Sequence, residues 1–142
     1  MNFDLTDEQK DIIKAAREFA EKEFPDLAQE CDREEKSPKP LWEKACKLGF
    51  VGVFIPEAYG GQGLGYLEHC LINEEFWRGD PGIAHFILAG TFGSEMILLF
   101  GTEEQKRKWV PPLVKAKAIT GAAITEPDAG SDVSSVRTTA IL

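Results

Sequence analysis

Small polar residues able to hold a ligand gather in one stretch near the end of the chain, residues 121–132. The stretch carries two hydroxyl side chains, Thr125 and Ser131, and three carboxylates around a turn rich in Pro, Asp and Gly. Loops that directly follow a strand often carry binding residues. Free N–H groups and a serine hydroxyl bind phosphate oxygens, and Gly130 would let the backbone come close. The alternative from spacing alone is a serine-capped turn.

The other chemically capable side chains are two histidines and three cysteines. Cys31, Cys46 and Cys70 are widely spaced inside helical patterns, which fits reduced thiols better than a disulfide framework. None of them has metal-ligand spacing with His69 or His85, so the sequence predicts no metal site.

Length, charge and apolar content set the class of protein. With 142 residues the chain is long enough for one hydrophobic core. It carries 24 acidic and 16 basic residues, with no basic stripe interleaved with aromatics, so nucleic acid is not expected as a partner. Residues 1–5 have no basic or apolar pattern of a signal peptide, so we expect no signal or transit peptide and a protein of the cytoplasm, or of the mitochondrial matrix in a eukaryote. The longest apolar region, residues 82–100, is broken by polar residues, so we expect a buried helix and no membrane span.

Helices must position the loop, because almost everything before it has helical periodicity. The segments Thr6–Gln9 and Thr102–Gln105 each have the pattern of a capping box that starts a helix. Apolar residues recur at helical spacing in residues 41–48 and 64–77. Residues 82–100 are apolar nearly all round, which predicts one central helix.

The pattern changes after residue 117. Ile119–Thr125 and Thr138–Leu142 read as strands. Two short strands do not form a stable sheet alone. We therefore expect a helical domain over residues 1–117 and, over residues 118–142, the beginning of a truncated β-domain.

Residues 122–132 read Ala-Ala-Ile-Thr-Glu-Pro-Asp-Ala-Gly-Ser-Asp. This segment resembles the Thr-Glu-Pro-x-Ala-Gly-Ser-Asp signature of the acyl-CoA dehydrogenase family. Residues 6–9, 48–61 and 100–106 also resemble segments of that family, in the same order. The resemblance covers the whole chain. It implies a mainly α fold: the helical N-terminal domain of the acyl-CoA dehydrogenase type, followed by the first strands of an incomplete β-barrel-like domain.

The resemblance also implies FAD-dependent oxidation of an acyl-CoA thioester to the trans-2-enoyl-CoA. The residues it assigns to FAD binding are Ala122, Ile124, Thr125, Gly130 and Ser131. The residues it assigns to the substrate are Ser131, His85 and Leu88, although a histidine in an apolar helix is also typical of a core. It gives this chain no catalytic residue, because the family's base lies in the C-terminal domain. Glu126 is interpreted as a turn residue.

The partners implied are an acyl-CoA substrate, an electron-transferring flavoprotein and further copies of the full-length chain, as a homotetramer or homodimer. Three alternatives stay open: an acyl-CoA oxidase, a flavin monooxygenase relative on the same fold, or a helical interaction module without catalysis. Residues 1–142 by themselves are expected to bind FAD weakly, to be inactive and to expose an apolar patch.

Overall fold

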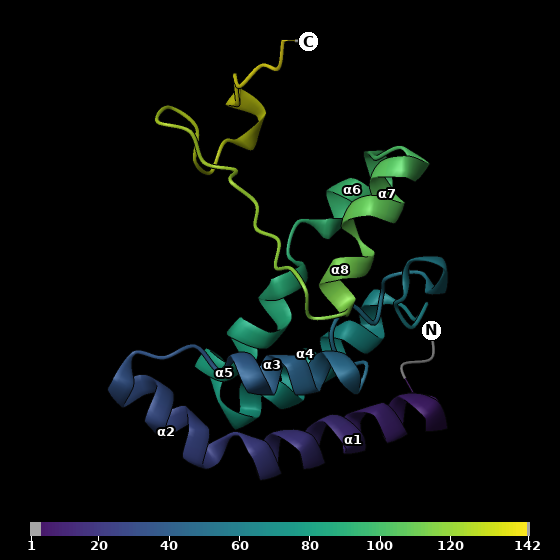
Figure 1. Cartoon of the computed structure of the whole chain (residues 1–142), viewed down its shortest axis with the longest axis vertical. Coiled ribbons are helices and arrows are strands. Elements are labelled where there is room, and N and C mark those ends of the chain that lie inside the picture. The colour runs from purple at the N-terminus through teal and green to yellow at the C-terminus, as the bar shows by residue number, and fades with distance from the viewer. Residues whose placement is uncertain (1–3, 142) are drawn as a thin grey trace.

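The chain is mainly helical in the computed structural model, which describes residues 4–141 (Figure 1). The α-helices of this range are α1 (Asp7–Glu23), α2 (Pro25–Glu34), α3 (Lys39–Lys47), α4 (Tyr66–Gly79), α5 (Pro81–Leu88), α6 (Ser94–Phe100), α7 (Glu103–Trp109) and α8 (Pro111–Val114). Three short 3-10 helices accompany them: η1 (Glu57–Tyr59), η2 (Ala89–Thr91) and η3 (Val133–Ser135). The mainly α fold predicted from the sequence is confirmed.

Two capping boxes start α1 and α7 as predicted. The Thr6 hydroxyl accepts a hydrogen bond from the Gln9 N–H at 3.1 Å, and the Gln9 side chain accepts one from the Thr6 N–H at 3.0 Å. Thr102 and Gln105 repeat the arrangement at 3.2 and 2.8 Å. Each box satisfies two backbone donors that the first helical turn would otherwise leave unpaired.

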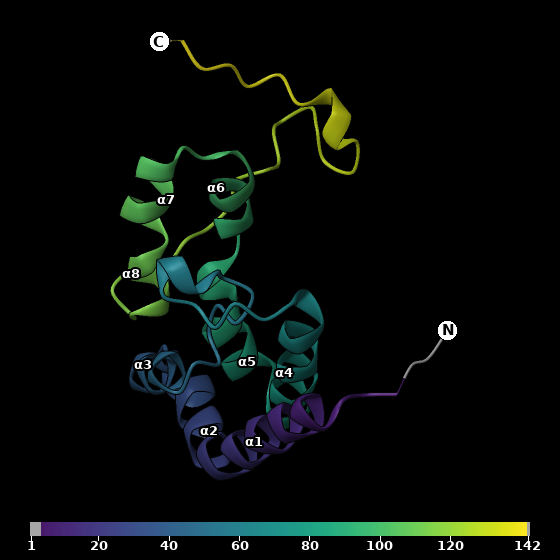
Figure 2. The same cartoon turned by 90° about the vertical axis from the view of Figure 1, so that its right-hand side faces the viewer.

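The main core lies between α1, α3, α4 and α5, which form the lower body of the molecule in Figure 2. Four phenylalanines from three segments meet there: Phe19, Phe24, Phe50 and Phe76. The Phe76 ring lies 5.5 Å from Phe19, 5.3 Å from Phe24 and 5.3 Å from Phe50, measured between centroids. This cluster fixes α1 against α4, and α5 packs on α4 in turn.

A smaller core joins α6, α7 and α8 to that body. Residues 50–55 form irregular turns. From them Phe54 and Ile55 pack with Val110 and Val114. The Tyr59 hydroxyl donates to the Glu103 carboxylate at 2.9 Å and ties η1 to α7.

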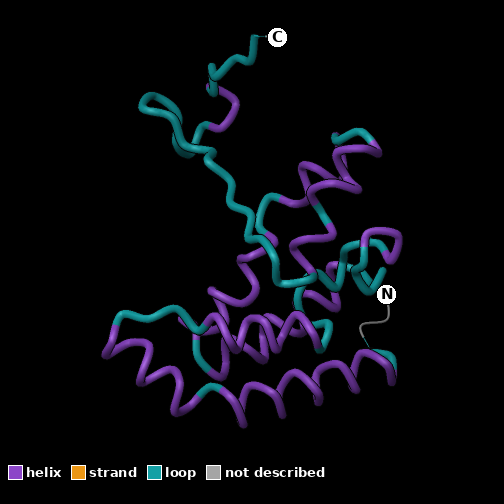
Figure 3. The backbone as a smooth tube through the Cα atoms, viewed as in Figure 1, coloured by secondary structure: helices purple, strands orange, loops and turns teal. Residues whose placement is uncertain are grey.

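Neither predicted strand forms in the part of the chain that the structure describes. Residues 119–125 and 138–141 are drawn as loop in Figure 3, and the one β-type pairing described is an isolated bridge between Glu126 and Ala129. Strands are stabilised by hydrogen bonds to a neighbour, and no other described segment lies alongside these residues as a strand. Leu142, the last residue of the second predicted strand, lies outside the described range.

The single central helix predicted for residues 82–100 is also wrong, because the segment breaks into α5, η2 and α6. Gly93 has φ +92°, a left-handed conformation that ends any continuous helix. The second half is not buried either: Leu99 is 70% exposed and Phe100 is 77% exposed. Among the described residues, Pro81–Phe100 is long and apolar enough to cross a membrane by length and composition only, and 39% of its apolar stretch is buried in the fold.

Candidate functional site

A cavity of about 570 Å³ lies beside α5, and three of the predicted site residues line it. Its walls come from α4, α5, η2, the start of α6 and the extended residues 119–122. Two predicted substrate residues, His85 and Leu88, meet one predicted cofactor residue, Ala122, around this space. The structure thus brings together residues more than thirty positions apart in the sequence.

Helix α5 carries His85 and Leu88 into the cavity wall. Asp80 caps the helix, with its carboxylate accepting from the Ile83 N–H at 2.8 Å, and Pro81 occupies the first turn. Leu88 is buried, whereas the His85 side chain is exposed and meets Trp77 edge-on at 6.5 Å between ring centroids. His85 is therefore at the open side of the site and is not a core histidine.

The break at η2 lets the extended segment lie against the helices. The Thr120 N–H donates to the Gly90 carbonyl at 3.0 Å, and the Thr120 hydroxyl contacts the same oxygen at 3.3 Å. Gly90 is closely surrounded, since a Cβ there would stand 3.2 Å from Trp42 Nε1. The anchor holds residues 119–122 along the cavity edge.

The remaining predicted cofactor residues follow Ala122 in the chain, beyond the hydrogen bonds between Thr120 and Gly90. Ile124, Thr125, Gly130 and Ser131 are exposed and do not line this cavity. None of the backbone N–H groups of residues 121–125 donates a hydrogen bond within the described chain. The segment therefore offers a row of unused donors next to the cavity, which is the chemistry that an anionic or carbonyl-rich ligand needs.

Glu126 holds the loop itself together, as its turn interpretation predicted. Its carboxylate accepts from the backbone N–H groups of Arg137 and Thr138 at 2.9 and 2.7 Å and from the Thr138 hydroxyl. These bonds, led by the one from the Thr138 side chain, lower the pKa of Glu126. Asp132 accepts in the same way from the hydroxyls of Ser134 and Ser135 and opens η3.

His69 also lines this cavity, and the sequence predicted no substrate or cofactor role for it. It lies on α4, four residues before Asn73 and eight before Trp77, and all three line the same cavity. Burial lowers the pKa of His69, and the nearby Glu95 opposes that shift. The spacing 69, 73, 77 was the available signal, because residues four apart share one face of a helix.

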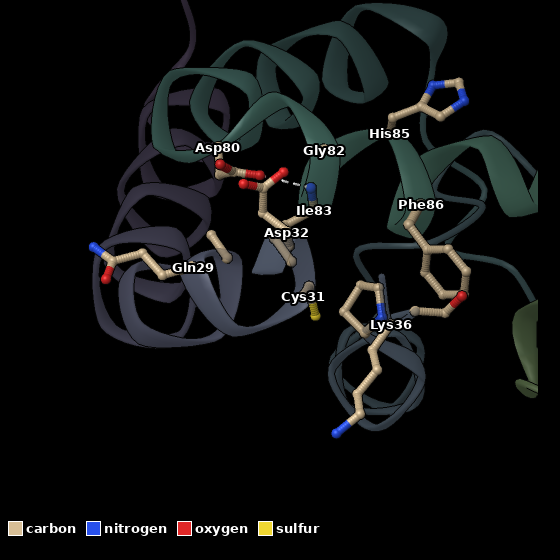
Figure 4. A pocket seen from close by; sticks show the side chains of 12 residues that line it. Gln29, Cys31, Asp32, Lys36, Asp80, Gly82, Ile83, His85 and Phe86 are labelled. Carbon is tan, nitrogen blue, oxygen red and sulfur yellow. Dashed lines mark hydrogen bonds between the residues drawn. The ribbon is translucent and has the colours of Figure 1, made fainter. Parts of the chain in front are cut away.

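A second cavity, about 590 Å³ in volume, lies between α2, the loop before α3 and the start of α5 (Figure 4). Of the predicted site residues only His85 borders it, and in the close-up the His85 ring points away from Cys31 and Asp32. Lys36, the basic residue on its rim, already pairs with Glu34. The cavity beside residues 119–122 is therefore the better candidate site. No group of three or more His, Cys, Asp or Glu side chains within residues 4–141 is placed to hold a metal ion.

Comparison with known proteins identifies the family. Residues 6–117 match the model of the acyl-CoA dehydrogenase N-terminal domain. The chain belongs to the acyl-CoA dehydrogenase family. Among curated members, acryloyl-CoA reductase (NADH) of Anaerotignum propionicum is 39% identical over 100% of this chain and 36% of that protein.

Solved structures of acyl-CoA dehydrogenases have the same fold. Butyryl-CoA dehydrogenase from Megasphaera elsdenii superimposes with a TM-score of 0.83 at 37% identity, covering 97% of this chain and 37% of that one. An acyl-CoA dehydrogenase from Bacillus anthracis in complex with FAD gives 0.82 at 36% identity, covering 94% of this chain and 23% of that one. The chain thus spans well under half the length of these relatives.

Proposed function

We propose that this chain is the N-terminal part of an FAD-dependent acyl-CoA dehydrogenase that converts an acyl-CoA thioester to the trans-2-enoyl-CoA. One observation carries the proposal: the segment that leads directly into the family signature at residues 125–132 runs along the edge of a cavity, with Ala122 in its wall and helices forming the other walls. A site for a flavin and an acyl chain needs such an arrangement, with polar backbone groups on one side and buried apolar surface on the other.

FAD is the proposed cofactor, and the residues present fit it. The unused N–H groups of residues 121–125 and the Thr125 hydroxyl are free to donate to the flavin ring. Around Gly130 nothing in the described chain lies within 4 Å of an added Cβ, so a pyrophosphate has room beside Gly130 and Ser131. When bound, FAD supplies the acceptor for the hydride that leaves the substrate Cβ. Ala122 and Ile124 would then lie against the ring.

The acyl chain is proposed to occupy the cavity. Leu88 gives it a buried apolar wall, His85 lies at the open side, and Ser131 would reach the CoA portion of the substrate. We assign the catalytic base to no residue of this chain. What the described residues contribute is binding, orientation and exclusion of water, which strengthens hydrogen bonds to charge that develops in the reaction.

Electrons are proposed to pass to an electron-transferring flavoprotein, with the enzyme a cytoplasmic homotetramer or homodimer. A reductase that runs the same chemistry in reverse is the second candidate, because acryloyl-CoA reductase (NADH) is 39% identical to the chain. Oxidase activity would instead appear as peroxide formed in air without a partner flavoprotein.

The test uses the full-length protein. It should purify yellow, and its flavin absorbance should bleach when butyryl-CoA is added anaerobically. For a reductase, bleaching should instead follow addition of NADH with the partner flavoprotein, and crotonyl-CoA should restore the colour. A full-length protein that shows no flavin spectrum even after incubation with FAD would refute the proposal.

Two variants test the assigned residues. Ser131→Ala should weaken FAD binding about tenfold, since it removes one hydrogen bond to a charged phosphate. Thr125→Ala should slow flavin reduction by a similar factor of about ten, since it removes a donor to the reduced ring. Thr139→Ala, at an exposed threonine outside the signature, is the matched control and should change neither quantity.

A further inference from the structure

One face of α4 turns polar and aromatic side chains toward the candidate cavity. His69, Asn73 and Trp77 succeed one another at four-residue intervals, and all three line it. A pocket for an unsubstituted alkyl chain needs only apolar walls such as Leu88. The polar groups of α4 therefore require an explanation beyond holding a hydrocarbon chain.

His69 brings an unpaired hydrogen-bonding group to this cavity. Its Nδ1 is buried and has no hydrogen-bond partner within residues 4–141. The imidazole packs edge-on against Phe54, with 5.2 Å between centroids, which fixes the ring. The other ring nitrogen, Nε2, is not fully enclosed and makes no hydrogen bond to the described chain. A fixed ring with one free nitrogen beside a cavity is a specific point of recognition.

The protonation state of His69 decides what that nitrogen offers. Burial lowers the pKa of His69, more than Glu95 raises it, so the ring is neutral at pH 7. A neutral imidazole has one N–H and one acceptor nitrogen. A buried N–H without a partner is rarer than a buried unpaired acceptor, so Nδ1 is the bare nitrogen and Nε2 carries the hydrogen. Nε2–H is then the free donor of this cavity-lining residue.

Glu95, at the start of α6, adds an acceptor to the same cavity. One of its carboxylate oxygens accepts from the Gly93 N–H at 3.0 Å, and the other has no partner among the described residues. A hydroxyl group both accepts and donates, and it matches this pair. An anionic group would be repelled by Glu95, and an alkyl group would give no hydrogen bond to His69 or to the second Glu95 oxygen.

Resting on the proposed function, we propose that His69 and Glu95 select acyl-CoA thioesters whose acyl chain ends in a neutral hydroxyl over thioesters with plain alkyl chains. His69 and Glu95 are specificity residues in this assignment and take no part in the removal of hydrogen. Asn73 and Trp77 complete the wall between His69 and the open side at His85.

The experiment measures binding to the full-length FAD-loaded enzyme by isothermal titration calorimetry. The probes are 4-hydroxybutyryl-, 5-hydroxypentanoyl- and 6-hydroxyhexanoyl-CoA, each paired with the thioester in which a methyl group replaces the hydroxyl. For at least one pair we expect the hydroxyl compound to bind about tenfold more tightly, the usual effect of a satisfied hydrogen bond in a buried site. Flavin bleaching is recorded in parallel.

Variants assign the preference to His69. His69→Phe keeps the ring and its packing on Phe54 but removes the donor, and it should reduce the preference to about twofold or less. His69→Gln restores a donor and should recover part of it. Cys70→Ser, an exposed neighbour on the same helix, should keep the full preference.

The outcomes separate the two proposals. Equal binding of hydroxyl and methyl compounds in all three pairs, or an unchanged preference in a folded His69→Phe enzyme, overturns the inference even if alkyl thioesters bleach the flavin. If no thioester bleaches a flavin-loaded enzyme, the proposed function fails, and the calorimetric preference still decides the role of His69.

Discussion

Glu75 is the clearest case of a single residue that holds two elements together. It is buried at 6% exposure on α4, and its carboxylate accepts from Arg17 on α1 at 2.7 and 2.9 Å. Arg78 donates to it at 3.0 Å and also to Glu21 on α1 at 2.9 Å. A buried carboxylate is stable only when paired in this way. The hydrogen bonds from Arg17 chiefly lower the pKa of Glu75 to about 2.

This shift predicts how stability depends on pH. Because the folded-state pKa is depressed, Glu75 stabilises the fold above its unfolded pKa of roughly 4.3, and the effect is lost as pH falls toward about 2. Glu75→Gln should lower the free energy of unfolding by about 2 kcal/mol at pH 7, a value reduced for the half-exposed Arg17. Urea unfolding followed by circular dichroism at several pH values measures it.

The control for this prediction is Glu74→Gln, an exposed carboxylate one position away that makes no ion pair in the described chain. The difference between the wild type and Glu75→Gln should shrink as the pH is lowered from 5 to 2. A difference that stays constant over that range would mean that packing, and not charge, makes Glu75 important.

The sequence placed single residues of the candidate site only in part. His85, Leu88 and Ala122 line the same cavity, and the substrate and cofactor roles that the resemblance gives them stay predictions. His69 was not predicted as a site residue, because a single histidine on a helix has no second metal ligand at a suitable spacing. Only the fold shows that His69 and Glu95 line the same cavity. The roles of Thr125 and Ser131 stay predictions, because both residues are exposed and neither lines the candidate cavity.

At the scale of elements, the break between α5 and α6 decides the shape of the site. Gly93 has φ +92°, its N–H donates to Glu95 and its carbonyl accepts from the Met96 N–H at 3.2 Å. A Cβ on Gly93 would also stand 3.4 Å from the Ala122 side chain. The glycine therefore turns the chain and orients Glu95, and residues 121–122 lie next to it.

Gly93→Ala tests this role. An alanine held at positive φ costs about 1–2 kcal/mol, so the melting temperature should fall by about 5 °C. Gly130→Ala is the control, because within the described residues an added Cβ at Gly130 meets nothing within 4 Å. Differential scanning fluorimetry compares the two. Equal melting temperatures for both variants would mean that the turn tolerates a side chain and relaxes without loss.

Elements were predicted well where their signals are local and poorly where they are not. The boxes at Thr6 and Thr102 use side chains three residues apart, and both helices begin there. The helix expected over residues 82–100 failed because apolar composition does not reveal a left-handed glycine. The strands predicted for residues 119–125 and 138–142 did not form because a strand needs a second strand to pair with, and no described segment lies beside residues 119–125 as a strand.

At the scale of the whole molecule, the smaller core leaves one side of α6 and α7 uncovered. Met96, Leu99, Phe100 and Trp109 are between 53% and 77% exposed, although they lie on helices. We call these four residues the α6–α7 patch. Figure 2 shows α6 and α7 standing above the main helical body, with the segment after residue 118 leading away from them. An apolar surface of this kind usually marks contact with another part of a protein.

The 142-residue chain alone should therefore bind a hydrophobic dye and self-associate. Leu99→Lys together with Phe100→Ser should reduce 8-anilinonaphthalene-1-sulfonate fluorescence about twofold or more, because the two side chains are 70% and 77% exposed and contribute much of the patch. The same substitutions should change the free energy of unfolding by less than about 1 kcal/mol, since exposed side chains contribute little to the core.

Ile141→Ser, an isolated exposed residue at 96%, should leave dye binding unchanged. A chain that sediments as a strict monomer and binds little dye would show that the patch is too small or too divided to act as a docking surface. If the double variant is monomeric while the wild type associates, the α6–α7 patch is the surface through which the chain self-associates.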